Sequence, residues 1–326
     1  MPSASPEIDR ASQMVTPDTI YRQLPEGLSV RVRVPASSAN LGPGFDCLGI
    51  ALGIHDEIDV ATTAGGITVD VTGEAATDVP LDANHLVVRA VLGGLAHAGF
   101  SVAGLHLSAT NVIPHSRGLG SSAAAAVSGL AAASGLLAAS GLADRLTADE
   151  MVQLSSEFEG HPDNAAASVL GSAVVTWTES SDGLNRYHAR RLRVHPDICA
   201  TVFVPETESS TAVTRGLLPD AVPRVDAVAN LSRSALAVVA LTSDPSCLLA
   251  ATEDRLHQPY RAEAMRPTAD LVAALRARGH AATVSGAGPS VLVLGSGPLP
   301  ADARSLGVEF GFTPKSVEIA GGVEIA

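Results

Sequence analysis

The sequence predicts an α+β protein of two domains. Strand-like and helix-like segments are mixed in both halves of the 326 residues, without the regular alternation that marks a doubly wound parallel sheet. The length suits two domains of ordinary size, and a hydrophobic fraction of 46% is enough for a substantial core. Aromatic residues make up 3%, so Ala, Val, Leu and Ile must form most of that core. We place the domains at residues 28–171 and 172–326.

Charge and cysteine usage narrow the class of protein. The chain has 34 Asp and Glu against 21 Lys and Arg, a formal charge of −13, and no basic cluster with interleaved aromatic residues, which argues against a nucleic-acid partner. Cys47, Cys199 and Cys247 form no CxxC pair, so neither a disulfide framework nor a zinc site is expected. The first residues lack the basic and apolar regions of a signal peptide. We expect a cytoplasmic protein that does not enter a membrane.

The first half opens with a polar stretch, residues 1–27, whose scattered prolines predict a loose extension. The strict alternation at 29–34 predicts a half-buried strand, which runs into a turn-rich segment at 35–49. Two strands, a helix and another strand follow at 51–62, 66–72, 84–98 and 105–113.

A long helix is predicted from Ser121 to about Ala139. It has nearly the length of a membrane span, but small residues dominate it, so a closely packed core helix is the better interpretation. Thr147 and Glu150 resemble a capping box at the start of the next helix, which ends in the polar segment 157–164. Beyond it we predict strands at 172–178, 200–204, 281–284 and 291–294, and helices at 226–241, 244–256 and 268–278.

The turn at residues 114–122, directly before the long helix, is the feature around which the chain is organised. Gly118 and Gly120 let the backbone approach a ligand closely, and the first turn of the helix leaves N–H groups unpaired. With the helix dipole they suit an anion such as phosphate, and Ser121 or Ser122 could cap the helix or reach a phosphate-bound Mg²⁺. On spacing alone, a tight connection without any ligand is the alternative.

This turn is not a Walker A motif, because GxxxxGK[ST] requires a lysine and Lys315 is the one lysine in the sequence. The same scarcity leaves no suitable lysine for a protein-kinase fold or for a Schiff base.

Glu159, His161, Asp163 and Asn164 form a compact polar cluster where a helix is predicted to end. A plain helix C-cap with glycine and proline breakers would explain the cluster structurally. In the functional interpretation Glu159 holds Mg²⁺, because carboxylates and phosphate oxygens form the usual Mg²⁺ shell, while His161 and Asp163 meet a substrate.

Four residues outside these segments are further candidates: Asn40, Asp46, Arg215 and Arg261. Asn and Asp in a turn most often cap it, and a surface salt bridge is the default role of an arginine. Arginine also binds carboxylates bidentately, so Arg215 and Arg261 are candidates for binding a carboxylate ligand.

The glycine-rich and polar segments resemble, in order, the motifs of the GHMP small-molecule kinases, a family that comprises galactokinase, homoserine kinase, mevalonate kinase and phosphomevalonate kinase. Pro-x-x-x-Gly-Leu-Gly-Ser-Ser-Ala-Ala at 114–124 is similar to the family's phosphate loop. Segments 35–46 and 159–164 resemble the homoserine kinase branch, and 285–290 resembles the third family motif. These motifs span residues from about 30 to 295.

The resemblance implies a two-domain GHMP-kinase-like fold, whose N-terminal domain is similar to domain 2 of ribosomal protein S5, with ATP and substrate meeting between the domains. It implies ATP-dependent phosphorylation of the L-homoserine hydroxyl to O-phospho-L-homoserine, a step of threonine biosynthesis. Another kinase of the family, acting on a mevalonate-like or sugar substrate, and a non-catalytic binding relative are the alternatives. A homodimer is compatible with the sequence.

The resemblance also implies roles for single residues. The ATP phosphates would contact Pro114, His115, Ser116, Arg117, Gly118, Leu119, Gly120, Ser121 and Ser122. Mg²⁺ would bind Ser122 and Glu159, although the very short segment before His161 leaves Glu157 as a second metal candidate. Homoserine would contact Asn40, Asp46, His161, Asp163, Arg215 and Arg261, the arginines taking its carboxylate. Asp163 or Asn164 would orient the reacting hydroxyl, and neither is assigned as a base.

Overall fold

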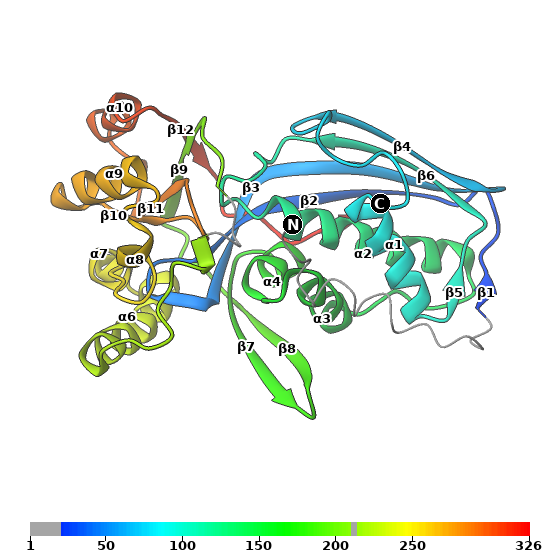
Figure 1. The fold of residues 1–326 in the computed structure, drawn as a ribbon, viewed down its shortest axis with the longest axis horizontal. Helices are drawn as coiled ribbons and strands as arrows, with labels where there is room; N and C mark the ends of the chain where they lie inside the picture. The colour runs from blue at the N-terminus through cyan, green and yellow to red at the C-terminus, as the bar shows by residue number, and fades with distance from the viewer. Residues whose placement is uncertain (1–20, 210–213) are drawn as a thin grey trace, which may run out of the picture.

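The computed structural model describes residues 21–209 and 214–326, which form two domains placed next to one another (Figure 1). The larger sheet has the strand order β13-β2-β3-β6-β4, and the β7–β8 hairpin is joined to it through β3. Its strands are β2 (Ser29–Asn40), β3 (Gly44–Thr63), β4 (Gly66–Gly73), β6 (Gly104–Asn111), β7 (Ala173–Ser181), β8 (Leu184–Leu192) and β13 (Glu324–Ile325). The smaller, antiparallel sheet has the order β10-β11-β9-β12. Its strands are β9 (Ile198–Pro205), β10 (Ala281–Val284), β11 (Val291–Ser296) and β12 (Phe312–Val317).

Helices cover both sheets, so the predicted α+β class is confirmed. The first domain holds α1 (Leu86–His97), α2 (Ser121–Ser140), α3 (Ala148–Glu159) and α4 (Asp163–Leu170). The second holds α6 (Arg224–Thr242), the 3₁₀ turn η1 (Pro245–Cys247), α7 (Leu248–Ala251), α8 (Gln258–Arg261), α9 (Arg266–Ala277) and α10 (Ala301–Glu309). The predicted capping box of α3 is present, because Thr147 and Glu150 exchange their hydrogen bonds.

Small residues build the core of the first domain. Most of α2 is buried, and at Gly129 an added Cβ would collide with the carbonyl oxygen of Val87 in α1. The two helices therefore pack closer than a side chain at that position would allow, which accounts for a large core with few aromatic residues. By length and composition α2 could also cross a membrane, as could α6, but α2 is plainly a core helix.

The second domain has a core on each face of its sheet. Along β9 and β11 alternate residues point to opposite faces, so Val202 and Leu292 join the core that continues into the first domain. Phe203 and Val293 join a separate cluster with Leu271 of α9 and further residues of α10. Continuity of the first of these cores ties the two domains together.

The structure corrects the prediction of a turn-rich segment at 35–49. β2 continues as far as Asn40, and Ala39 still pairs with Gly49 of β3. The turn between these strands is only residues 41–43. Ser37 and Ser38 are fully buried, and hydrogen bonds of their hydroxyls with Asn164 and Ser285 compensate for the loss of water. The small polar residues of this segment therefore suggest a turn, although those up to Asn40 belong to a strand.

The predicted helix at 244–256 is present only in its first part, as η1 and α7. After η1 and α7 the chain leaves helical geometry at Thr252, and α8 starts only at Gln258. The carboxylate of Asp254 accepts hydrogen bonds from the backbone N–H groups of Leu256, His257 and Gln258. Such local side-chain bonds compete with helix formation and hold the connecting loop instead.

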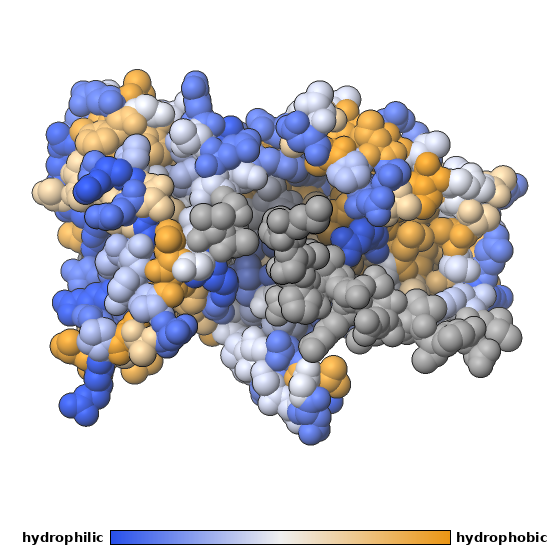
Figure 2. All heavy atoms as spheres, in the orientation of Figure 1, coloured by the Kyte–Doolittle hydropathy of each residue, from blue (hydrophilic) through white to orange (hydrophobic). Residues whose placement is uncertain are grey.

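Several elements were not predicted. α4 begins within the polar cluster, at Asp163, and β8 completes a hairpin that projects from the body (Figure 1). In Figure 2 the tip of this projection carries both polar and apolar residues. Because β7 pairs with β3, the larger sheet extends beyond the predicted boundary at 171/172. β1 (Arg22–Gln23) pairs with β5 (Phe100–Ser101), so the chain is ordered before residue 28, whereas residues 1–20 lie outside the described part.

Candidate active site

A cavity of about 440 Å³ lies where four loops meet. The loops are the β2–β3 turn, the 112–120 segment before α2, the α3–α4 connection and the 285–290 turn between β10 and β11. Its lining includes Asn40, Asp46, Ser116, Gly118, Gly120, Ser121, Ser122, Glu159, His161, Asp163, Asn164, Arg215 and Arg261. Candidates that are far apart in the sequence are therefore brought together in one cleft.

The loop before α2 is held by close backbone contacts. Gly118 and Gly120 have φ of +71° and +69°, in the region that favours glycine. A Cβ on Gly118 would collide with the carbonyl of Ser285, and one on Gly120 would collide with the Ser37 hydroxyl and lie 3.0 Å from Asn164 Oδ1. Gly120 is the N-cap of α2 and offers no side-chain cap, so N–H groups of the first turn stay available for an anion.

Ser122, in this first helical turn, donates a hydrogen bond of 2.6 Å to Glu159 Oε1. Burial raises the pKa of Glu159, an effect that the hydrogen bond from Ser122 and the charge of His161 partly oppose. Glu157 instead accepts a bond from Gln153, is exposed and does not line the cavity. One hydroxyl and one carboxylate beside a phosphate-sized space are a donor set that fits Mg²⁺, which takes its remaining ligands from phosphates and water.

His161, Asp163 and Asn164 form a hydrogen-bonded unit at the start of α4. One carboxylate oxygen of Asp163 lies 2.8 Å from His161 Nδ1 and also accepts the backbone N–H of Asn164. Asp163 is almost wholly buried. Burial alone would lower the pKa of His161, but its hydrogen bond to Asp163 and the charges of Asp163 and Glu159 leave that pKa above its ordinary value.

Asn40 and Asp46 close the β2–β3 turn. Both have positive φ, +70° and +55°, and the Asn40 side chain donates to Gly286 O while accepting from the backbone N–H of Asp46. The carboxylate of Asp46 makes a bidentate pair with Arg215, with N···O distances of 2.8 and 2.9 Å. The pair is fixed in geometry and carries no net charge.

Phe45 separates this pair from a second guanidinium. Arg215 Cζ lies 5.4 Å from the centroid of the Phe45 ring, and Arg261 Cζ lies 5.5 Å from it. Arg261 is 1% exposed, and within the described residues its hydrogen bonds go to Thr214 O and His257 Nδ1, neither of which is an anion. Burial, followed by the nearby charge of Arg215, lowers the pKa of Arg261. A buried cation bonded to neutral groups is suited to an anionic ligand.

Not every predicted residue faces the cavity. Pro114, His115, Arg117 and Leu119 are absent from its lining. The Arg117 guanidinium donates to carbonyl oxygens of His115, Pro205 and Glu206. Leu119 is a core residue whose carbonyl accepts from the Ser37 N–H. Conversely, Phe45, Phe158 and Ser209 line the cavity without having been given a role, and only Phe45 lay in a recognised motif.

A second cavity, of about 300 Å³, joins the first at Ser116, Ser121 and Ser122. It is mostly apolar, with Ile58, Val79, Pro80, Leu86 and Val87 in its walls and His85 and His115 among its polar residues. The start of α2 thus separates two adjoining spaces.

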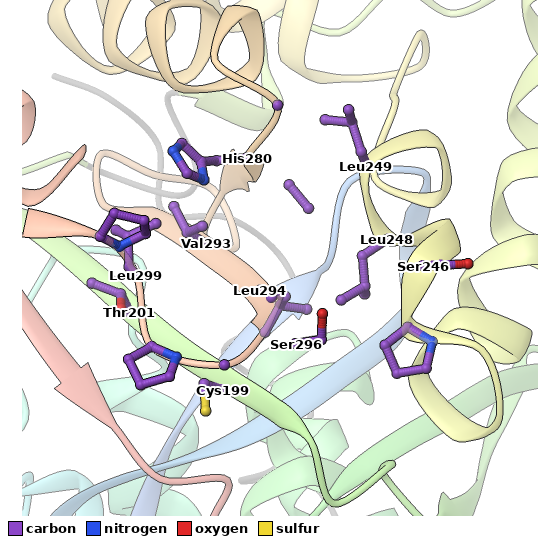
Figure 3. Close-up of a pocket in the computed structure, with 17 residues that line it drawn as sticks. Cys199, Thr201, Ser246, Leu248, Leu249, His280, Val293, Leu294, Ser296 and Leu299 are labelled. Carbon is purple, nitrogen blue, oxygen red and sulfur yellow. The ribbon is translucent and has the colours of Figure 1, made fainter. Parts of the chain in front are cut away.

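A further hollow, of about 370 Å³, lies in the second domain beside β9, β10 and β11 (Figure 3). Cys199, Ser246, His280, Leu294 and Leu299 line it, and none of the predicted site residues does. It shares no lining residue with the site described above.

Comparison with known families gives matches in both domains. Residues 85–172 match the GHMP kinases N terminal domain, and residues 237–306 match the GHMP kinases C terminal domain. The first match contains the loop before α2 and the α3–α4 connection, and the second contains Arg261 and the 285–290 turn. The fold and the site together define a small-molecule kinase of the GHMP class.

Close relatives cover nearly the whole chain. Homoserine kinase of Rhodococcus erythropolis is 57% identical over 93% of this chain and 98% of its own length, and that of Mycobacterium tuberculosis is 54% identical over 89% and 92%. The crystal structure of homoserine kinase from Cytophaga hutchinsonii superposes with a TM-score of 0.79 at 25% identity, covering 91% of this chain and 97% of its own. The chain therefore belongs to the homoserine kinase branch of the GHMP kinases.

Proposed function

We propose that this protein transfers the γ-phosphoryl group of ATP to the side-chain hydroxyl of L-homoserine, a step of threonine biosynthesis. The observation that carries the proposal is that a single cavity is lined both by the phosphate-type loop at the start of α2 and by a set of acidic and arginine side chains. An amino-acid substrate presents an ammonium and a carboxylate, which this set can bind separately.

The nucleotide is assigned to both adjoining cavities. The apolar cavity beside Leu86 and Val87 fits a base and ribose, and its junction with the first cavity at Ser121 and Ser122 brings the phosphates to the N-terminus of α2. Ser122 and Glu159 would hold Mg²⁺, which supplies charge neutralisation for the phosphates when bound.

The acceptor end is assigned to the charged side chains. Arg261 would bind the carboxylate, because its hydrogen bonds within the described residues go to neutral acceptors and leave N–H groups for an anion. Asp46, oriented by Arg215, would face the ammonium, with Asp163 as the second carboxylate in reach. Asn164 or Asp163 would orient the hydroxyl, and phosphoryl transfer needs such positioning more than a strong base.

The test is ADP release in a coupled assay with Mg·ATP and, at equal concentrations, L-homoserine, L-serine, mevalonate or galactose. We expect turnover with L-homoserine above all others. Turnover with mevalonate or galactose in its place would keep the phosphate loop and overturn the assignment of the acceptor end. Nucleotide binding without turnover of any of the four would favour a non-catalytic relative.

We also propose a homodimer formed through α6. Val225, Val228, Leu231 and Val239 project from one side of this helix and are between 44% and 71% exposed. Val225 and Val239 lie at equal distances in sequence from Ser232, so a copy related by a twofold axis would place each valine against the other. The self-complementary apolar face supports a second copy of this chain as its partner.

Light scattering after size-exclusion chromatography tests the dimer. The wild type should have the mass of two chains and Leu231→Asp the mass of one, because the substitution places a charge in an apolar contact. Leu184→Asp is the control, since Leu184 is similarly exposed, at 65%, but lies on the β7–β8 hairpin. A monomeric wild type would contradict the proposal.

A further inference from the structure

His257 is fully buried between two parts of the site that come from different domains. Its Nε2 lies 2.8 Å from Gly42 O in the β2–β3 turn, and its Nδ1 lies 3.2 Å from Nη1 of Arg261. Its ring centroid is also 5.2 Å from that of Phe45. One imidazole therefore contacts the β2–β3 turn next to Asp46, the ring of Phe45, and the arginine assigned to the substrate carboxylate.

The partners of the two ring nitrogens define one protonation state. A carbonyl oxygen can only accept, so Nε2 must carry the proton that is donated to Gly42. A guanidinium can only donate, so Nδ1 must be the unprotonated acceptor for Arg261. The neutral Nε2–H tautomer satisfies both contacts, whereas protonation of Nδ1 would place two donors and two positive charges against one another.

The backbone around His257 is fixed independently of the substrate. Asp254, also fully buried at its side chain, accepts the N–H groups of Leu256, His257 and Gln258, and its Oδ2 lies 3.5 Å from His257 Nε2. Arg261 follows one helical turn later, and its N–H bonds to the carbonyl of His257. The imidazole and the guanidinium thus belong to the same short segment, residues 257–261, which is held in place by Asp254.

We propose that His257 is a positioning residue, which in its neutral Nε2–H form fixes the Arg261 guanidinium against the β2–β3 turn so that Arg261 meets the homoserine carboxylate. This inference rests on the proposed function, because it presumes that Arg261 binds the substrate. The bond from Nη1 to the imidazole removes one donor direction of the guanidinium, and the bond from Nε to Thr214 O removes another. The remaining N–H groups are then oriented before the substrate arrives, which reduces the cost of binding.

Two substitutions separate the two contacts of His257. In His257→Asn the amide oxygen can take the place of Nδ1 and accept from Arg261, but the donor to Gly42 is lost. In His257→Gln the amide nitrogen can take the place of Nε2 and donate to Gly42, but the acceptor for Arg261 is lost. Both variants remove the ring, so each controls for the packing lost in the other.

The experiment measures the Kd of L-homoserine by calorimetry, which needs no turnover, together with KM for both substrates and the Tm. We expect His257→Gln to weaken homoserine binding about tenfold with little change in the KM of ATP, and His257→Asn to weaken it about twofold at most. Equal losses in the two variants, or losses that follow Tm alone, would overturn the positioning role.

Arg261→Ala and the double variant complete the design. We expect Arg261→Ala to weaken homoserine binding about a hundredfold, and His257→Gln to add nothing further in that background. If Arg261→Ala weakens binding and His257→Gln does not, the proposed carboxylate site stands and the inference about His257 is overturned. If Arg261→Ala leaves binding unchanged, both are overturned.

Discussion

The two ends of the cleft are built from different parts of the chain. At the phosphate end the backbone forms the surface, and Gly118 and Gly120 are in contact with neighbouring backbone and side chains that leave no room for a Cβ. At the acceptor end the lining consists of ionic side chains: Asp46 pairs with Arg215, and the guanidinium groups of Arg215 and Arg261 both lie against the ring of Phe45.

This difference has consequences for substitution. Substituting a side chain leaves the peptide N–H groups in place. The phosphate end therefore tolerates only substitutions that preserve its backbone geometry. Side chains can be exchanged singly, so the acceptor end can change its ligand while the fold is kept. Damage to the first end should therefore affect catalysis as a whole, and damage to the second should affect the amino acid alone.

The largest effect is expected at the proposed metal position. Glu159→Gln should lower kcat about a thousandfold, because it removes a carboxylate that would hold Mg²⁺ beside the phosphates. Glu157→Gln is the matched control, since Glu157 is exposed and bonds to Gln153 outside the cavity. Steady-state kinetics at saturating Mg·ATP distinguish the two, and the opposite pattern would move the metal site to Glu157.

The phosphate end is tested by comparing the two glycines that flank α2. Gly120 and Gly141 flank α2 with similar φ of +69° and +66°, but a Cβ on Gly141 meets nothing within 4 Å. Gly120→Ala should lower kcat/KM for both substrates about a hundredfold. Gly141→Ala should cost about 1 kcal/mol of stability and leave kinetics unchanged. Equal kinetic losses would show that left-handed geometry, rather than the crowded loop, limits catalysis.

The acceptor end is tested by two bidentate pairs. Asp46→Asn breaks the pair with Arg215 and should raise the KM of L-homoserine about tenfold without altering that of ATP. Asp59→Asn breaks an equally close pair with Arg31 on the exposed surface of the larger sheet and should change neither KM. An effect of Asp46→Asn on ATP alone would assign this turn to the nucleotide.

The smallest effect concerns the pH dependence of stability. His85 is buried at the N-cap of α1, where Nδ1 accepts from the Val87 N–H; burial, followed by the charge of His115, lowers its pKa. Because the unfolded chain takes up a proton first, the stability present above pH about 6.5 is lost as the pH falls from there through the lower pKa of the folded state. His85→Asn keeps a capping group and should flatten this loss in urea unfolding at about pH 7.5 and 5.5. Parallel pH dependence of both proteins would contradict the assignment.

The sequence predicts the loops of the site more accurately than the strands around them. The positions of Gly118, Gly120, Glu159 and Asp163 followed from motifs in which residue type and spacing are constrained by local chemistry. The strand character of residues 35–40 did not follow, since it depends on buried partners such as Asn164 and Ser285 that are distant in the chain.

The same distinction applies to single side chains. Arg117 lies within the recognised loop, yet its guanidinium is held by carbonyl oxygens of the 205–206 segment, which no local pattern could show. His257 lies outside every motif, and its contact with Gly42 arises only when the two domains meet. Local patterns identify positions in a loop, and tertiary packing decides where their side chains point.

The pairing of β13 with β2 bears on how the chain is synthesised. Glu324 pairs with Arg33, and Ala326 exchanges both backbone hydrogen bonds with Arg31, so residues from far along the chain complete the sheet begun near its start. During translation one edge of β2 stays unpaired until these residues leave the ribosome. By then the glycine-rich loop and α2 have already emerged. An exposed strand edge is prone to pairing with other chains. Yield of native enzyme should therefore depend on chaperones that shield nascent chains.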